Sequence, residues 1–122
     1  MLKIIKNAGN NIVDEDAIRS IAAAIFNLGA EEVMVIGHTD CGMAGSDAKK
    51  LEKTMLERGI PQEEIDKYDL KSWIGGFKDE KENVLDNVDK IKNHPLIPND
   101  VPIHGLMIDI VSGELEIVSD DR

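Results

Sequence analysis

The chain has 122 residues, a length that suits one domain with one hydrophobic core. Its formal net charge of -10 comes from 24 acidic and 14 basic side chains, and such a surface would repel nucleic acid phosphates and anionic lipid, so we exclude DNA, RNA and membrane surfaces as partners. The chain lacks an apolar run of roughly 20 residues and a secretory signal at its start, which predicts a cytoplasmic protein.

The first third of the chain predicts two strands separated by a helix. Residues 2–6 are a short strand candidate, which ends in the turn-forming residues 7–11. A helix begins at the acidic residues 14–16 and continues, with apolar residues at helical spacing, until Gly29. Residues 33–37 form a continuous apolar run, which is typical of a parallel strand covered on both faces. We therefore expect residues 33–37 to be the main core strand.

The middle of the chain predicts helices and one apolar loop. Residues 46–58 read as a helix that is capped by Ser46. Pro61 is expected to begin a short further helix. Residues 73–77 are interpreted as a loop with apolar anchors.

The last third predicts a helix followed by two strands. Asp79, with Glu82 three residues later, marks the start of the helix. Its expected buried face consists of Val84, Leu85, Val88 and Ile91. Residues 101–110 form a second buried strand that begins near Ile103, and residues 114–118 alternate charged and apolar side chains, as an antiparallel edge strand does. These elements predict an α/β fold.

The only cysteine, Cys41, lies in a loop at the carboxyl end of the predicted core strand. Open α/β sheets bind their ligands at this edge. His38 precedes Cys41 by three residues, a spacing that lets both side chains reach one tetrahedral zinc ion. Structural zinc needs four protein ligands and catalytic zinc about three with water, so two ligands do not complete a site. From these residues alone, Cys41 is a metal ligand, a reactive thiol or a buried small side chain beside a loop histidine.

A family resemblance extends over essentially the whole chain. Residues 33–43 (VMVIGHTDCGM) resemble the strand and loop of beta-class carbonic anhydrases, and residues 3–10 are similar to that family's Asn-Ala-Gly turn. Residues 93–98 and 101–115 resemble its last parallel strand and final hairpin, especially in small archaeal and clostridial forms. The resemblance implies one domain, residues 1–122, with a mostly parallel sheet, an antiparallel carboxy-terminal edge strand and the family's first strand missing.

The resemblance also implies a zinc site and a reaction. Zinc would be held by His38 and Cys41, and the substrate pocket would be lined by Asn7, Ala8, Gly9 and Gly42. The family's reaction is the reversible hydration of carbon dioxide to bicarbonate, in which zinc lowers the pKa of water toward ~7. His94 and His104 are expected to be structural, and Asp40 is expected to bind local backbone N–H groups.

The sequence departs from the family pattern ahead of residues 2–6. The family carries a Cys-x-Asp-x-Arg segment there. The resemblance implies that this segment supplies a third zinc ligand and an Asp-Arg pair, and this chain has no counterpart of it. We therefore expect an N-terminally truncated form that holds zinc weakly and has little or no hydratase activity as this chain alone.

Three functional interpretations remain open. The chain belongs to a carbonic anhydrase whose catalytic segment lies in the native gene or in a second chain, or it is a non-catalytic remnant that serves as an oligomeric scaffold, or it is a redox-active thiol protein that uses Cys41. Loss of the first strand would leave a sheet edge open to pairing with another chain. We therefore expect a homo-oligomer, at least a dimer, whose interface includes residues near 2–11.

Overall fold

The computed structural model describes residues 2–45 and 47–121. The elements in chain order are η1 (Ala8–Asn10), α1 (Asp16–Leu28), β1 (Val33–His38), α2 (Ala48–Glu57), α3 (Gln62–Ile65), α4 (Leu70–Ile74), α5 (Glu80–Lys92), β2 (Ile103–Ile108) and β3 (Leu115–Ser119). Within the described ranges, no helix combines the length and the apolar character needed to cross a membrane.

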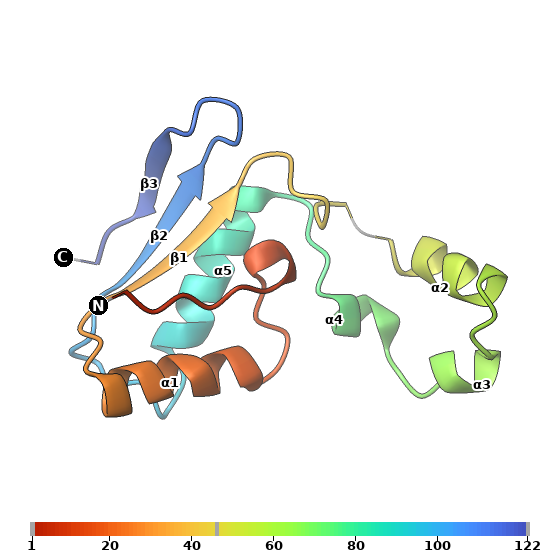
Figure 1. The fold of residues 1–122 in the computed structure, drawn as a ribbon, viewed down its shortest axis with the longest axis horizontal. Helices are drawn as coiled ribbons and strands as arrows, with labels where there is room; N and C mark the ends of the chain where they lie inside the picture. Colours follow the sequence, from red (N-terminus) through yellow and green to blue (C-terminus); the bar gives the residue numbers. More distant parts are fainter. Residues whose placement is uncertain (1, 46, 122) are drawn as a thin grey trace.

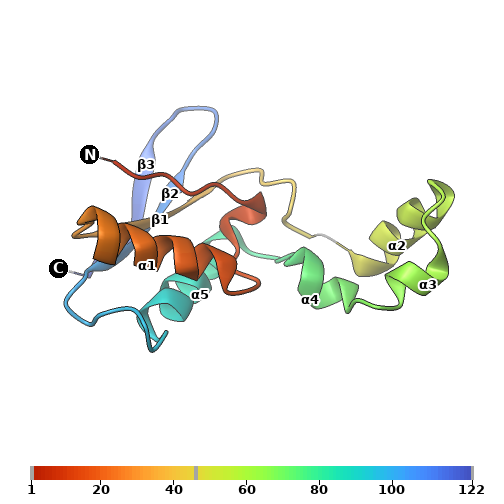
Figure 2. The same cartoon turned by 60° about the horizontal axis from the view of Figure 1, so that its bottom comes forward.

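The molecule consists of two regions, which we call the body and the arm. The body contains the sheet, α1 and α5, whereas the arm, residues 47–74, contains α2, α3 and α4. Figures 1 and 2 show the arm projecting away from the body in both views, joined to it by two stretches of chain. The carboxyl end of β1, where the candidate site is expected, lies in the body next to one of the two stretches that lead to the arm.

The sheet has the strand order β1-β2-β3. β1 and β2 are parallel, with Val33 opposite Ile103 and His38 opposite Ile108. β3 pairs with β2 in the antiparallel direction, with a register shift between Gly105 and Leu106. This topology confirms an α/β fold with an antiparallel carboxy-terminal edge strand.

Helix α5 covers one face of the sheet and builds the core with it. The helix begins as predicted, because the side chain of Asp79 accepts a hydrogen bond from the backbone N–H of Glu82 at 2.9 Å. A Cβ atom on Gly105 would lie only 2.8 Å from the Val84 side chain, so the absence of a side chain there lets α5 approach β2 closely. The buried core residues come from α1, α5, the sheet and the loops between them: Ile12, Ile18, Ile21, Val35, Val84, Val88, Ile91, Ile97, Ile103 and Met107.

The opposite face of the sheet, which we call the open face, has no helix packed on it among the described elements. On β1, Met34 and Ile36 keep 55% and 47% of their surface exposed, whereas Val35 between them is buried. On β3, Leu115 and Ile117 are also exposed, and they lie opposite Ile108 and Leu106 of β2. The expectation that residues 33–37 are covered on both faces was therefore wrong, since burial alternates along this strand.

Residues 2–6 do not form the predicted strand. Leu2 is 80% exposed, Ile4 and Ile5 are exposed as well, and the segment runs past the β1 side of the sheet without joining it (Figures 1 and 2). An apolar pattern favours a strand only where a neighbouring strand offers backbone hydrogen bonds. No strand among the described residues pairs with this segment.

Three further expectations need correction or completion. Trp73 and Ile74 belong to helix α4 and not to a loop, whereas Leu85 of α5 is exposed and not part of its buried face. Helix α2 is capped by Asp47, which accepts from the backbone N–H of Lys49 at 2.9 Å, and the predicted cap Ser46 lies outside the described residues. The short helix expected near Pro61 is confirmed as α3.

Candidate metal centre

The loop that carries Cys41 leaves β1 directly after His38 and is fixed to the end of β2. The backbone N–H of Thr39 donates to the carbonyl of Ile108 at 3.0 Å, and the Thr39 hydroxyl accepts from the N–H of Ile110 at 3.1 Å. The chain then turns, with the N–H of Ala44 donating to the carbonyl of Cys41 at 3.0 Å. The predicted site therefore lies at the carboxyl end of the parallel pair, where open α/β sheets place ligands.

The imidazole of His38 is oriented by its own loop. Its Nδ1 atom lies 2.8 Å from the carbonyl oxygen of Thr39. A carbonyl oxygen can only accept a hydrogen bond, so this contact requires the proton on Nδ1 and leaves the lone pair on Nε2 free. Ligating histidines have this arrangement, in which a hydrogen bond at one ring nitrogen fixes the other nitrogen for the metal.

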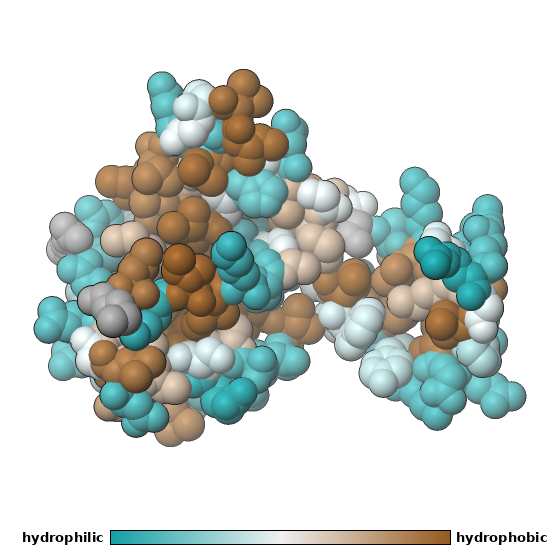
Figure 3. Space-filling view, viewed as in Figure 1, coloured by the Kyte–Doolittle hydropathy of each residue, from teal (hydrophilic) through white to brown (hydrophobic). Residues whose placement is uncertain are grey.

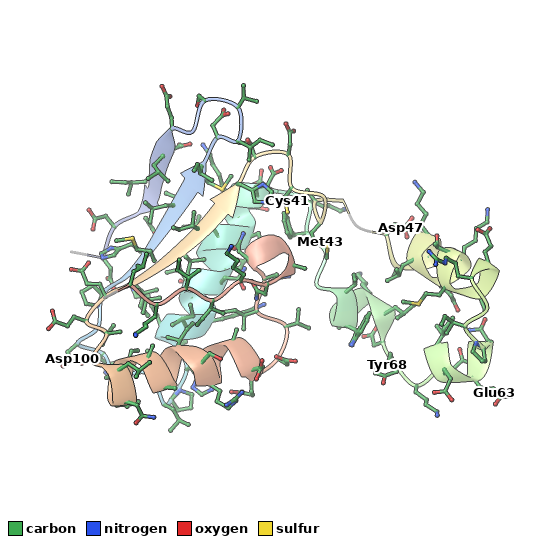
Figure 4. All side chains as sticks on the ribbon, in the orientation of Figure 1. Cys41, Met43, Asp47, Glu63, Tyr68 and Asp100 are labelled. Carbon is green, nitrogen blue, oxygen red and sulfur yellow. The ribbon has the colours of Figure 1, made fainter. Side chains whose placement is uncertain are left out.

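The thiol of Cys41 lies at the junction of the body and the arm. Figure 4 shows Cys41 and Met43 on the stretch of chain between the end of β1 and the arm. The Cys41 side chain is buried, with 8% of the residue exposed, and it is a free cysteine. As a soft sulfur donor three residues after an imidazole, it is chemically suited to zinc.

The predicted pocket turn lies against the loop that follows Cys41. Gly9 has φ 67°, and a Cβ atom there would lie 2.8 Å from the Phe77 ring and 3.0 Å from Met43. Only glycine fits both this backbone conformation and this close approach. The structure thus places Gly9 of η1 against Met43 in the loop that follows Cys41, and the role of Gly9 in a substrate pocket stays a prediction.

The other three predicted pocket residues are all solvent-exposed. Asn7 donates from its side chain to the carbonyl of Asn11 at 3.0 Å, and Ala8 is exposed beside it. Gly42 is exposed too, and a Cβ atom there would have no heavy atom within 4 Å. Their role in lining a pocket remains a prediction.

Two buried asparagines of α5 hold the pocket turn, and sequence reasoning missed them. Asn83 donates to the carbonyl of Gly9 at 2.8 Å, and Asn87 accepts from the backbone N–H of Ile12 at 2.7 Å. Asn87 also donates to the backbone carbonyl of Asn83 at 2.7 Å. The signal in the sequence is a pair of amides four residues apart beside the apolar stripe of a helix, where buried polar groups need partners.

One groove on the surface of α5 does not contain the predicted ligands. It has a volume of about 500 Å³ and is lined by Asn11, Gly76, Phe77, Asn83, Asp86, Asp89, Lys90 and Asn93. The amides of Asn11 and Asn83, which line this groove, already bind backbone carbonyls. The ligand chemistry of His38 and Cys41 therefore locates the candidate site better than this groove does.

Three further side chains were considered as site residues in the sequence, those of His94, His104 and Asp40. None of them has a hydrogen bond to His38 or Cys41 among the described residues. His94 contacts Glu15 at 2.8 Å, and His104 lies 3.0 Å from Glu32 and accepts from the N–H of Asp121 at 3.0 Å, so both histidines are structural as expected. Asp40 has φ 52°, and the structure gives its carboxylate no hydrogen bond within the described residues, contrary to expectation.

No group of three or more His, Cys, Asp or Glu side chains that could hold a metal ion exists in the parts of the chain that the structure describes. The donors present thus fit zinc in chemical type and fall short of a complete site in number.

Comparison with known proteins assigns the family. Residues 1–115 match the family model described as carbonic anhydrase. The chain is 43% identical over 124 residues to the putative carbonic anhydrase YtiB of Bacillus subtilis, covering 96% of this chain and 66% of that protein. A carbon disulfide hydrolase of Acidithiobacillus thiooxidans is 31% identical, with 96% of this chain and 58% of that protein covered.

Solved structures agree with this assignment. The beta-carbonic anhydrase isoform I of Trichomonas vaginalis has a TM-score of 0.90 and 36% identity, covering 97% of this chain and 68% of that one. The carbonic anhydrase of Streptococcus mutans has a TM-score of 0.80 and 30% identity, covering 94% and 65%. The chain thus spans about two thirds of the length of these relatives, and it belongs to the carbonic anhydrase family, in its beta class.

Proposed function

We propose that this chain supplies His38 and Cys41 as two protein ligands of a zinc site that serves the reversible hydration of carbon dioxide to bicarbonate. The observation that carries the proposal is the contact between Nδ1 of His38 and the carbonyl of Thr39, which leaves Nε2 available three residues before a thiol. Family membership supports the reaction.

The rest of the chain orients this pair and the turn beside it. Asn83 fixes the carbonyl of Gly9, and Gly9 in turn lies against Met43 and Phe77. The thiol of Cys41 is buried, and the hydrogen bonds of Thr39 to Ile108 and Ile110 keep the loop at the end of the sheet. When bound, zinc supplies Lewis-acid chemistry, which makes a nearby water a better nucleophile at neutral pH.

A complete catalytic site needs at least one more protein ligand than the described residues offer. We propose that this ligand comes from outside residues 2–45 and 47–121, either from further sequence of the same protein or from a second chain. We expect a protein that consists of these 122 residues alone to hold zinc weakly. We also expect it to hydrate carbon dioxide no faster than free zinc does.

Metal titration is the first test of this proposal. Cobalt added to the protein is expected to give a thiolate-to-cobalt charge-transfer band, which Cys41→Ser abolishes and His38→Ala weakens. His94→Ala is the matched control, because His94 is an imidazole engaged with Glu15 at another place in the fold. Absence of the charge-transfer band from the unmodified chain at saturating cobalt, or a control that behaves like His38→Ala, would show that the ligand assignment is wrong.

Stopped-flow assays with a pH indicator test the reaction itself. Robust hydration by this chain, lost in His38→Ala, would contradict our expectation for the isolated chain and would place a complete site within it. Carbon disulfide is worth including as a second substrate, since relatives at 31% to 33% identity carry the name carbon disulfide hydrolase.

We also propose a cytoplasmic homo-oligomer, at least a dimer, with residues 2–11 at or near the interface. The exposed side chains of Leu2, Ile4 and Ile5 support this part of the proposal, because a cluster of large apolar groups in water favours burial against another surface. The other two functional interpretations, a scaffold without catalysis and a redox-active thiol protein, have no structural feature in their favour. The burial of the Cys41 thiol argues against the redox interpretation.

A further inference from the structure

The side chain of His104 departs from the burial pattern of the open face. A Cβ atom on Gly105, the next residue of β2, would be directed at Val84 of α5, so the side chain of His104 points to the opposite face of the sheet. Figure 3, which views the molecule from that side, shows hydrophobic side chains gathered over the sheet. Met34, which lies opposite His104 in the register, keeps 55% of its surface exposed, whereas His104 keeps 5%. A buried imidazole beside exposed apolar groups needs an explanation, because burying a polar side chain is costly unless it is hydrogen-bonded.

Three segments of the chain meet at this imidazole ring. Its Nε2 atom lies 3.0 Å from the carboxylate of Glu32, in the segment that leads into β1. Its Nδ1 atom accepts from the backbone N–H of Asp121 at 3.0 Å and lies 3.3 Å from the carboxylate of Asp120, both in the segment that follows β3. Helix α5 contributes Lys92, which binds the carboxylate of Asp121 at 2.9 Å. Within the described residues, both ion-pair contacts of the His104 ring are thus with carboxylates.

These contacts determine where the protons of His104 lie. The ionised carboxylate of Glu32 can only accept a hydrogen bond, so Nε2 carries a proton. The backbone N–H of Asp121 needs an acceptor, so Nδ1 of the neutral ring carries a lone pair. The same Nδ1 atom lies beside an oxygen of Asp120, which accepts a hydrogen bond but cannot donate one while ionised. Nδ1 therefore has a partner for each of its two states, the N–H of Asp121 for the lone pair and the carboxylate of Asp120 for a proton.

We infer that His104 is a pH-dependent switch for the carboxy-terminal segment, residues 119–121. In the neutral state the ring accepts from Asp121 and holds the segment in the conformation of this structure. When Nδ1 binds a proton, it no longer accepts from Asp121 and donates instead to Asp120, while Nε2 keeps its bond to Glu32. Histidine is the side chain whose charge ordinarily changes between about pH 5 and 8, which suits it to such an exchange of partners.

The exchange of partners moves a small part of the molecule. The carboxylate of Asp121 accepts from the backbone N–H of Ile103 at 3.0 Å and from Lys92 at 2.9 Å, so the side chain of Asp121 stays attached when its N–H is released. Ser119, two residues earlier, pairs with Gly105 beside the register shift between β2 and β3. Protonation therefore loosens the end of the edge strand β3 and leaves α5 and the β1–β2 pair in place.

His94 is a matched control within the same chain. Its Nδ1 atom accepts from the backbone N–H of Leu96 at 3.1 Å, and its Nε2 atom lies 2.8 Å from the carboxylate of Glu15, so His94 and His104 share one arrangement. The described residues place no carboxylate within ion-pair distance of Nδ1 of His94. Protonation of His94 therefore breaks its bond to Leu96 without a replacement, and of the two histidines only His104 has a second partner at Nδ1.

Nuclear magnetic resonance of the full chain during an acid titration tests the inference. Long-range proton–nitrogen correlation spectra show which nitrogen of each imidazole carries a proton, and backbone amide exchange follows Asp121 in the same samples. The neutral ring of His104 is expected to carry its proton on Nε2. As Nδ1 takes up a proton, the amide of Asp121 should exchange about tenfold faster or more, while the amides of α5 stay protected.

Two substitutions separate the exchange of partners from a general loss of structure. Asp120→Asn removes the carboxylate that receives the proton, so it should weaken proton binding by His104 about threefold or more and leave His94 unchanged. His104→Asn keeps a side-chain oxygen near the position of Nδ1 and takes up no proton in this pH range, so the amide of Asp121 should stay protected wherever the chain is folded. The side chain of Asp120 is exposed, so Asp120→Asn tests the inference even where a substitution of the buried His104 prevents folding.

Each of the following results would overturn the inference. They are a proton on Nδ1 of the neutral ring, no proton uptake by His104 before the chain unfolds in acid, an Asp121 amide that does not respond to that uptake, and proton binding that Asp120→Asn leaves unchanged. His38→Ala and Cys41→Ser should not alter the titration of His104, because both ligands lie at the opposite end of the sheet. A failed zinc assignment and a failed switch therefore give different results.

Discussion

Helices α5 and α2 begin in the same way and end in different surroundings. Each follows an aspartate whose side chain accepts a backbone N–H, from Glu82 onto Asp79 and from Lys49 onto Asp47, both at 2.9 Å. α5 buries five of its residues, three apolar ones in the core and two asparagines against the turn at residues 9–12, whereas α2 in the arm buries none. The comparison shows that capping and spacing determine that a helix forms, while the chain around it decides whether its apolar side chains are covered.

The largest expected difference between body and arm is in the cost of removing a buried isoleucine. Ile91→Ala on α5 should lower the free energy of unfolding by about 2 to 5 kcal/mol, because it leaves a cavity in a closed core. Ile65→Ala in the arm should cost clearly less, since the arm can lose its structure locally while the body stays folded. Urea denaturation followed by circular dichroism measures both, and equal losses would mean that the arm unfolds together with the body.

A second, smaller effect tests the close approach of α5 to the sheet. Gly105→Ala should destabilise the body by about 1 to 3 kcal/mol, since the new Cβ would lie 2.8 Å from Val84 and 3.2 Å from Val88. Gly42→Ala is the control in the loop that follows β1, where a Cβ would meet nothing within 4 Å, and it should change stability little. Thermal melts of both variants provide the comparison, and an unchanged melting temperature for Gly105→Ala would show that α5 can move away freely.

The smallest effect concerns a surface carboxylate that ties the carboxy-terminal segment to the body. A hydrogen bond from Lys92, followed in size by one from the backbone N–H of Ile103, lowers the pKa of Asp121 below its ordinary value. A carboxyl group whose pKa is lower in the folded protein than in the unfolded chain stabilises the fold at pH values above its ordinary pKa. This stabilisation disappears as the pH falls through the pKa of the group in the folded protein.

Asp121→Asn should therefore lower the melting temperature slightly at pH 7 and leave it close to that of the unmodified chain at strongly acidic pH. Glu64→Gln provides the comparison in the arm, where the exposed Lys67–Glu64 pair at 3.0 Å is expected to contribute nothing measurable. A difference between Asp121→Asn and the unmodified chain that grows as pH falls would have the wrong sign for this explanation.

Local sequence signals predicted most helices and the strands that pair. Asp79 and Glu82 marked the start of α5, and the apolar residues around Ile103 marked β2, because capping and apolar runs act over a few residues. Residues 2–6 have a similar apolar pattern and form no strand, since a strand also requires a partner that the pattern does not specify. The exposed faces of β1 and of the arm escaped prediction for the same reason.

The candidate site divides in the same way. The position of His38 and Cys41 at the end of a strand followed from the order of elements along the chain. The contacts of Asn83 with Gly9 and of Gly9 with Phe77 join residues more than 60 positions apart, and no local pattern encodes them. Only the three-dimensional structure shows that α5 helps to hold the pocket turn.

The side-chain amides of α5 also determine the order in which parts of the protein can fold during synthesis. Residues 9 to 12 leave the ribosome before the groups that bind them, on Asn83 and Asn87, which are synthesised some 75 positions later. Residues 9 to 12 can therefore reach their native contacts only after α5 has emerged. Because these contacts close a long loop, their formation is a late step in folding. During that interval the side chain of Ile12, which is buried in the finished fold, is available to chaperones or to a neighbouring nascent chain.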